Sequence, residues 1–146
     1  MSRRRVLAAL TVAVAAVTLV ACGPDHSPRA RSVDGNLQFA VCVPIEASRV
    51  ELLVGPDGQD PYDFPPVWVR DGSHVFDAAS VLVVGAAPEG MDATGDPSEV
   101  DVDTDRIAVR IVSDRPGQDT QVSEWKAGAI SDSAWSNGAD EKPCAA

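Results

Sequence analysis

Four acidic side chains at alternate positions form the stretch whose residue types and spacing best indicate a metal site. Glu99, Asp101, Asp103 and Asp105 are separated from one another by single residues. If this stretch is extended, alternate side chains point to one face and lie about 7 Å apart along the strand. Ca²⁺ prefers oxygen ligands, so the pattern predicts a calcium site. The competing interpretation is an acidic loop whose side chains are solvated.

Two further aspartates are candidate calcium ligands, but the sequence does not match an EF-hand calcium loop. Asp92 and Asp96 lie upstream in a loop rich in glycine and proline, where they are candidates for extra ligands. The D-x-D-x-D spacing also begins an EF-hand loop, but Arg106 stands where that loop needs glycine and Val112 where it needs glutamate. The stretch is therefore not an EF-hand.

Catalytic side chains are few. The sequence contains neither a G-x-S-x-G elbow nor an H-E-x-x-H motif. His26 lies in a predicted linker, which leaves His74 as the histidine expected within the fold, and we interpret it as a loop residue. The carboxylates are numerous enough for some pair to lie close together, so a small hydrolase is the alternative function.

Aromatic residues gather around Pro65 and Pro66. Tyr62, Phe64 and Trp68 lie in or beside this loop. An exposed group of such rings is typical of a surface that binds a sugar or a peptide, so Tyr62 and Trp68 are predicted binding residues. The competing interpretation places these rings in the core or over an open end of the fold.

The N-terminal residues predict export. Three consecutive arginines, at positions 3–5, precede an uncharged, mostly apolar stretch over residues 6–20. A helix that crosses the hydrocarbon of a membrane needs roughly 20 residues, so these 15 residues are too few for an ordinary span. The arrangement is typical of a secretory signal peptide, which we expect to be helical.

The end of this stretch, Leu19-Val20-Ala21-Cys22, resembles the lipobox of bacterial lipoproteins. In that family the cysteine sulfur receives a diacylglycerol, and the signal peptide is then cut before the cysteine. The resemblance covers only the first 22 residues. It implies that residues 1–21 are a signal peptide and that Cys22 anchors the chain to the outer face of the cell membrane. An ordinary signal peptide with an incidental Cys22, or an uncleaved anchor, is the alternative.

Charge argues against nucleic acid as a partner. The 146 residues contain 12 basic and 22 acidic side chains, and removal of residues 1–21 leaves a net charge of −13. Binding of nucleic acid, or of anionic lipid through a basic patch, needs clustered lysine and arginine. The expected partners are therefore the membrane, through the lipid anchor, and an envelope protein or glycan.

The other two cysteines predict a disulfide. If Cys22 carries lipid, Cys42 and Cys144 are the thiols that remain, and an export compartment can oxidise such a pair. Neither lies in a CxxC pair or a Cys/His cluster typical of a metal site. No resident cofactor is expected apart from the calcium considered above.

Residues 22–36 contain prolines and glycines without apolar periodicity and are expected to form a flexible tether. Residues 37–146 should form one domain. Alternation of apolar and polar residues predicts short strands. The expected strands are 37–43, 50–54, 67–70, 80–85, 107–111 and 121–126.

These strands and the turns between them predict an all-β fold, a small antiparallel β-sandwich that is immunoglobulin-like in the loose sense, with a small barrel as the alternative. The continuous apolar run 80–85 favours a central strand buried on both faces. Residues 74–79 are expected to form a helical turn. Residues 120–135 fit strand or helix, and strand followed by loop is favoured because Gly128 weakens a helix.

One function is favoured by three features together: the predicted tether, the predicted sandwich and the lack of a recognisable group of catalytic residues. The chain is expected to be a lipid-anchored, non-enzymatic binding or interaction module on the outer face of the bacterial envelope. A small envelope hydrolase that uses paired carboxylates is the alternative.

Overall fold

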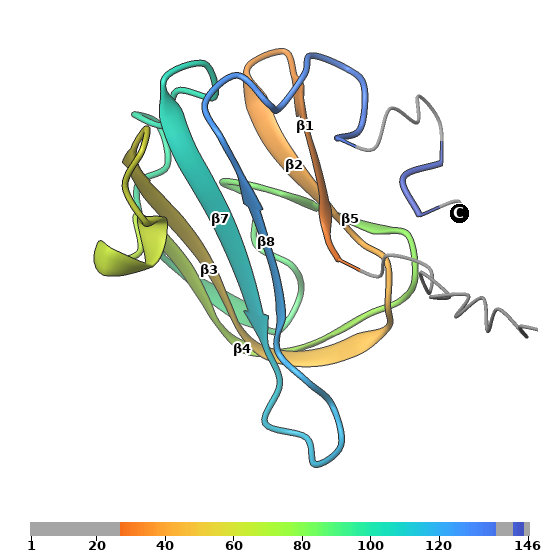
Figure 1. The fold of residues 1–146 in the computed structure, drawn as a ribbon. Coiled ribbons are helices and arrows are strands. Elements are labelled where there is room, and N and C mark those ends of the chain that lie inside the picture. Colours follow the sequence, from red (N-terminus) through yellow and green to blue (C-terminus); the bar gives the residue numbers. More distant parts are fainter. Residues whose placement is uncertain (1–26, 137–141, 145–146) are drawn as a thin grey trace, which may run out of the picture.

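The structure, a computed structural model, describes residues 27–136 and 142–144. These residues form a β-sandwich of two antiparallel sheets, as predicted (Figure 1). The predicted signal helix and the predicted lipidation site Cys22 lie outside the described residues.

The smaller sheet has three strands in the order β1 (Arg29–Val33), β2 (Asn36–Val41), β5 (Ser80–Val83). Ala30, Phe39 and Leu82 pair across it and all three are buried in the core. Arg31, Gln38 and Val83 form the adjacent row, whose side chains point to the outer face because successive residues of a strand alternate.

The larger sheet has five strands. Their order is β6 (Met91–Gly95), β4 (Trp68–Phe76), β3 (Ile45–Pro56), β7 (Asp105–Val112), β8 (Gln121–Trp125). A short 3-10 helix, η1 (Pro61–Asp63), follows β3 and contacts β3 and β7.

Alternate residues of both sheets fill the space between them. On β3 and β7, Val50, Leu52 and Val109 are fully buried. Phe39 of the smaller sheet stacks against Trp125 of the larger one, with 5.4 Å between ring centroids. This contact brings β8 to the β1–β2 side of the sandwich, and Figure 1 shows these strands side by side. The pattern confirms the period of two predicted for β2, β3, β7 and β8.

The predicted tether is wrong at its C-terminal end, because residues 29–33 form β1. Val33 pairs with Asn36, so Asp34 and Gly35 form a two-residue hairpin loop. Both residues have positive φ, 50° for Asp34 and 78° for Gly35, as a type I′ turn requires. The Asp-Gly pair was a hairpin signal, and the sandwich therefore begins before residue 37.

The predicted helical turn over 74–79 is also wrong, because β4 continues to Phe76. A register shift in the β3–β4 pairing lets the strand pass Gly72. Gly72 has φ of +143°, and a Cβ at this position would lie 2.1 Å from the Gly90 carbonyl oxygen. Only glycine fits this close approach.

The apolar run 80–85 is not a central strand. Its strand, β5, lies at the edge of the smaller sheet, and Val81 is 44% exposed. The segment 120–135 follows the favoured interpretation, since β8 covers Gln121–Trp125 and the residues after it form turns and a single bridge from Asp132 to Ser32. The edge strand β6 was not predicted.

Candidate functional site

The outer face of the smaller sheet is partly covered by the C-terminal segment. Ala40 points away from the core residues Phe39 and Val41, yet its side chain has no solvent exposure. Trp135, which follows the last strand by ten residues, is only 2% exposed. The chain after β8 therefore returns to the sheet that contains β1 and packs against it.

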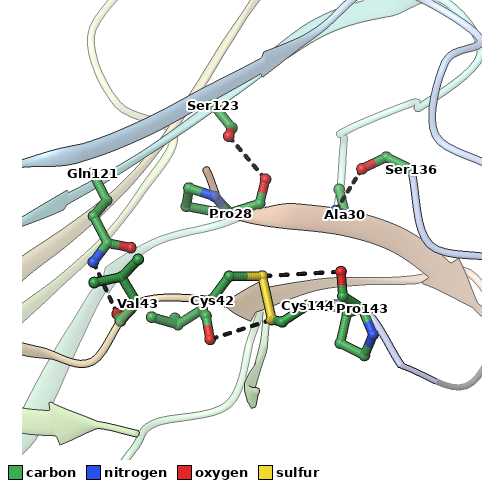
Figure 2. The surroundings of a disulfide bond; sticks show 10 residues. Pro28, Ala30, Cys42, Val43, Gln121, Ser123, Ser136, Pro143 and Cys144 are labelled. Carbon is green, nitrogen blue, oxygen red and sulfur yellow. Dashed lines mark hydrogen bonds between the residues drawn. A yellow bond between two sulfur atoms is a disulfide. The ribbon is translucent and has the colours of Figure 1, made fainter. Parts of the chain in front are cut away.

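Backbone pairing fixes this segment along the free edge of β1. Ser32 donates its N–H to the Ser131 carbonyl oxygen at 3.0 Å, and its own carbonyl accepts the Ser133 N–H at 2.7 Å. Ser136 donates to the Ala30 carbonyl at 2.8 Å, and the Ala30 N–H donates to Ser136 Oγ at 3.2 Å (Figure 2). The segment thus protects an edge that would otherwise offer unpaired backbone groups.

The predicted disulfide is confirmed. Cys42, just after β2, is bonded to Cys144 with 5.1 Å between their Cα atoms. Cys144 Sγ lies 3.7 Å from the Val41 carbonyl oxygen. The bond, shown in Figure 2, therefore holds Cys144 against β2. Trp135 belongs to the segment that pairs with β1, between the hydrogen-bonded residues Ser133 and Ser136.

A hollow of about 530 Å³ lies beside the disulfide. We call it the disulfide hollow. Its lining includes Arg31, Val81, Trp135, Lys142, Pro143 and Cys144. Most of this lining is apolar, and its charged members are both basic.

Arg31 is held in place by two contacts. Its guanidinium carbon lies 4.2 Å from the centroid of the Trp135 ring, a cation–π arrangement. Its Nε donates to Gln38 Oε1 at 2.9 Å. The side chain is therefore oriented before any ligand arrives, and its two terminal nitrogens have no acidic partner within the part of the chain that the structure describes.

Four arginines on or next to the larger sheet differ from Arg31. Arg49, Arg106, Arg110 and Arg115 each form an ion pair with a glutamate. A separate hollow of about 570 Å³ near the β3–β4 register shift is lined by one such pair, Arg115 with Glu46. Its one basic side chain is already paired, and its third charged residue, Asp114, is acidic, so it is the weaker candidate for binding an anionic ligand.

Glu51 is the centre of a charge network on the outer face of the five-stranded sheet, the largest among the residues that the structure describes. It is 6% exposed and accepts hydrogen bonds from Arg49 and Arg110, while Arg49 also pairs with Asp71 at 2.8 Å. Burial acts to raise the pKa of Glu51, but the hydrogen bonds from the two arginines outweigh it and lower the pKa. The network is satisfied internally and is best explained as structural.

Arg70 is a buried cation between the sheets. It is 2% exposed, its Nε donates to the Ala86 carbonyl oxygen at 2.9 Å, and its guanidinium lies 4.6 Å from the Trp68 ring centroid. Its Nη1 has no hydrogen-bond partner among the described residues. Burial lowers the pKa of the guanidinium, though it stays protonated at neutral pH.

The predicted aromatic binding face is wrong for Trp68, which is 1% exposed. Trp68 pairs with Leu52, and both side chains point into the core. Tyr62 is half-buried in η1, where Arg110 lies 5.7 Å from its ring centroid. Burial, followed by the charge of Glu124, raises the pKa of the Tyr62 hydroxyl. The two predicted binding residues therefore do not share a surface.

The predicted acidic ladder is not extended. Residues 98–104 form turns, and β7 begins only at Asp105. Asp101 Oδ1 accepts the N–H of Asp103, and Asp105 Oδ2 accepts the N–H of Asp101, each at 2.9 Å. These carboxylates close the turns of their own loop, because an aspartate side chain readily accepts from a nearby backbone N–H.

The other proposed ligands do not converge with these. Glu99 is exposed in the turn, and Asp92 lies on β6 opposite Asp71. Asp96 accepts the N–H of Ser98, which lowers its pKa. Within the described residues, no group of three or more histidine, cysteine, aspartate or glutamate side chains is placed to hold a metal ion. Calcium binding stays a prediction.

His74 lies on β4 rather than in a loop. Its Nδ1 is 2.9 Å from the Glu89 carbonyl oxygen, and its ring packs edge-on against Phe76. The carboxyls whose pKa is shifted, Glu51 and Asp96, are both held in the charged form. Neither supplies the protonated acid that a two-carboxylate hydrolase uses at neutral pH.

The sequence did not indicate the disulfide hollow. Arg31 was assigned to the tether and Trp135 to a loop, and Lys142 had no assigned role. The available signal was Cys144, because a disulfide to Cys42 requires the residues around Cys144 to lie close to the predicted strand over 37–43.

No protein-family model, curated protein or solved structure matches the chain. No helix within residues 27–136 and 142–144 is long and apolar enough to cross a membrane.

Proposed function

We propose that this protein is a lipid-anchored, non-enzymatic binding module on the outer face of the bacterial cell envelope, and that the disulfide hollow is its ligand site. The observation that carries the proposal is the combination of an apolar lining with Arg31 and Lys142, which have no acidic partner among the described residues. The chain has a net charge of −10, and its other surface ion pairs show that acids are available to neutralise arginine. An oriented Arg31 with no acidic partner among the described residues supports a role in binding an external group.

The short distance between the proposed anchor and the sandwich supports a partner near the membrane. Only six residues separate Cys22 from Arg29, the first residue of β1. Even a fully extended chain would place β1 at most about 25 Å from the lipidated residue. The proposed partners are therefore an envelope protein or a glycan that lies close to the membrane surface.

The anchor is tested with Cys22→Ser. We expect the wild type in the membrane fraction, labelled by an alkyne fatty acid, and the variant in the medium or as an unlabelled precursor. Ala21→Ser, which keeps the cysteine, is the matched control and should remain labelled. A labelled, membrane-bound Cys22→Ser protein would refute lipid attachment at this residue.

The binding site is tested by photo-crosslinking on intact cells. A photoreactive phenylalanine analogue replaces Val81, which lines the hollow and is 44% exposed. The matched control carries it at Val122, which is 46% exposed on the five-stranded sheet. We expect a product at Val81 that disappears with Arg31→Gln and is absent at Val122. Equal products at both positions would show that the hollow is not the binding site.

A further inference from the structure

We propose that the ligand of the disulfide hollow is an apolar group that carries a single carboxylate, with Arg31 binding the carboxylate and the wall around Val81 contacting the apolar part. This inference rests on the proposed function and specifies its ligand class. It follows from the geometry of Arg31, from the character of the lining and from the charge of the whole protein.

Arg31 is preorganised for a carboxylate. Gln38 accepts from Nε, and the Trp135 ring covers one face of the guanidinium. The donors that remain are on Nη1 and Nη2, which lie in one plane and can donate side by side to two oxygens. A planar carboxylate matches these donors, and the stacked indole removes much of the entropy cost of fixing the arginine.

The rest of the hollow favours an apolar body next to that carboxylate. Val81, which is 44% exposed, and Ala79 supply exposed apolar surface next to the buried Pro143 and the half-buried Cys144. A volume of about 530 Å³ is at the small end of ligand sites, enough for one branched side chain with its carboxylate. Apolar surface that an apolar ligand covers adds affinity that a bare anion would not gain.

The negative net charge of the protein favours a ligand that carries a single negative charge. Two basic side chains, Arg31 and Lys142, face the hollow, whereas the chain as a whole carries −10. A polyanion such as a nucleic acid or a phosphate-rich polymer would extend beyond these two cations into the negative field of the protein. One carboxylate can be neutralised locally by Arg31 without that repulsion.

The test is an NMR titration of the exported chain, with its disulfide intact, using three probes that share one side chain. N-acetylleucine represents the carboxyl end of a peptide, 4-methylpentanoate a free acid, and N-acetylleucinamide a neutral analogue. We expect both carboxylates to shift the Trp135 indole N–H and Val81 amide signals, and the amide to bind at least about tenfold more weakly, the usual loss for a charge-assisted hydrogen bond. Tighter binding of N-acetylleucine assigns a peptide end, and tighter binding of 4-methylpentanoate assigns a free acid. Equal binding supports a carboxylate ligand whose N-acetyl group makes no contact with the hollow.

Variants separate the roles of the two cations. Arg31→Gln should weaken carboxylate binding about ten- to a hundredfold, and Arg31→Lys should restore part of it. Lys142→Gln should cost about two- to fivefold, because it is exposed, and Lys126→Gln, away from the hollow, should have no effect. A melting curve of each variant shows whether it is folded.

The inference is refuted if the neutral amide binds as tightly as the acids, if none of the probes shifts Val81 and Trp135, or if folded Arg31→Gln binds with wild-type affinity. Its failure is distinguishable from failure of the proposed function. A specific crosslink at Val81 without carboxylate binding would leave the binding module in place with a different ligand.

Discussion

Replacement of Cys42 and Cys144 by serine tests how strongly the disulfide stabilises the fold. The bond joins residues separated by 102 positions. In the chain-entropy model, a cross-link of this span lowers the conformational entropy of the unfolded chain, which raises its free energy by about 5 kcal/mol. We therefore expect the double variant to lose about 4–5 kcal/mol of unfolding free energy, with a fall in melting temperature of roughly 15–25 °C.

Contacts independent of the disulfide define what should survive. Trp135 and the pairing of residues 131–136 with β1 do not need the sulfur atoms. The double variant should therefore stay folded at low temperature, while limited proteolysis should cut its last residues faster than those of the wild type. The assay is urea unfolding followed by tryptophan fluorescence, with the reduced wild type as the matched control.

Two outcomes would refute this reasoning. A loss below about 1 kcal/mol would show that the unfolded chain gains little freedom when the bond is absent, contrary to the entropic account. A reduced wild type that retains full stability while the serine variant does not would assign the effect to the serine side chains instead of the bond.

Three further predictions concern charged side chains. Glu51→Gln should cost about 1–3 kcal/mol at pH 7. The pKa of Glu51 is lower in the folded chain than its unfolded value near 4.5. The stability difference between wild type and variant should therefore be fully present above pH 4.5 and should disappear as the pH falls through the lowered folded pKa. Unfolding measured between about pH 3 and 7 tests this. Arg70→Met should leave stability within about 1.5 kcal/mol of the wild type or raise it, because a buried unpaired donor is removed; a loss above about 3 kcal/mol contradicts this. If the loop from Glu99 to Asp105 binds calcium, millimolar Ca²⁺ should raise the melting temperature relative to a chelator, and identical curves leave only the solvated loop.

Parts of the fold could be predicted from local sequence because their physical cause is local. Strands β2, β3, β7 and β8 are half-buried, so one face of each must be apolar, and this produces a period of two that is visible without the structure. The pairing of Cys42 with Cys144 followed from the cysteine count and the predicted export compartment, since it needed no knowledge of the intervening chain.

Edge elements lacked such a signal. β6 buries only Met91, so its sequence carries no apolar alternation, and β1 is short, with Ala30 and Ser32 as its inward residues. β5 is apolar on both faces, but its sequence could not show that the strand lies at an edge. The acidic loop was predicted as a strand because its charges alternate along the sequence. The sequence did not show that the carboxylates of Asp101 and Asp105 accept hydrogen bonds from backbone N–H groups of their own loop.

The candidate site was decided by tertiary structure. Arg31, Trp135 and Lys142 are far apart in the sequence and have no shared motif. They meet because the chain after β8 returns along β1 and is fixed by the disulfide next to β2. The amino-acid sequence by itself determined the half-buried strands, the cysteine pair and the acidic net charge, each of which depends on residue type and local spacing. Which cations lack an acidic partner among the described residues, and which apolar side chains stay exposed beside them, depends on long-range packing, so only the folded chain decided it.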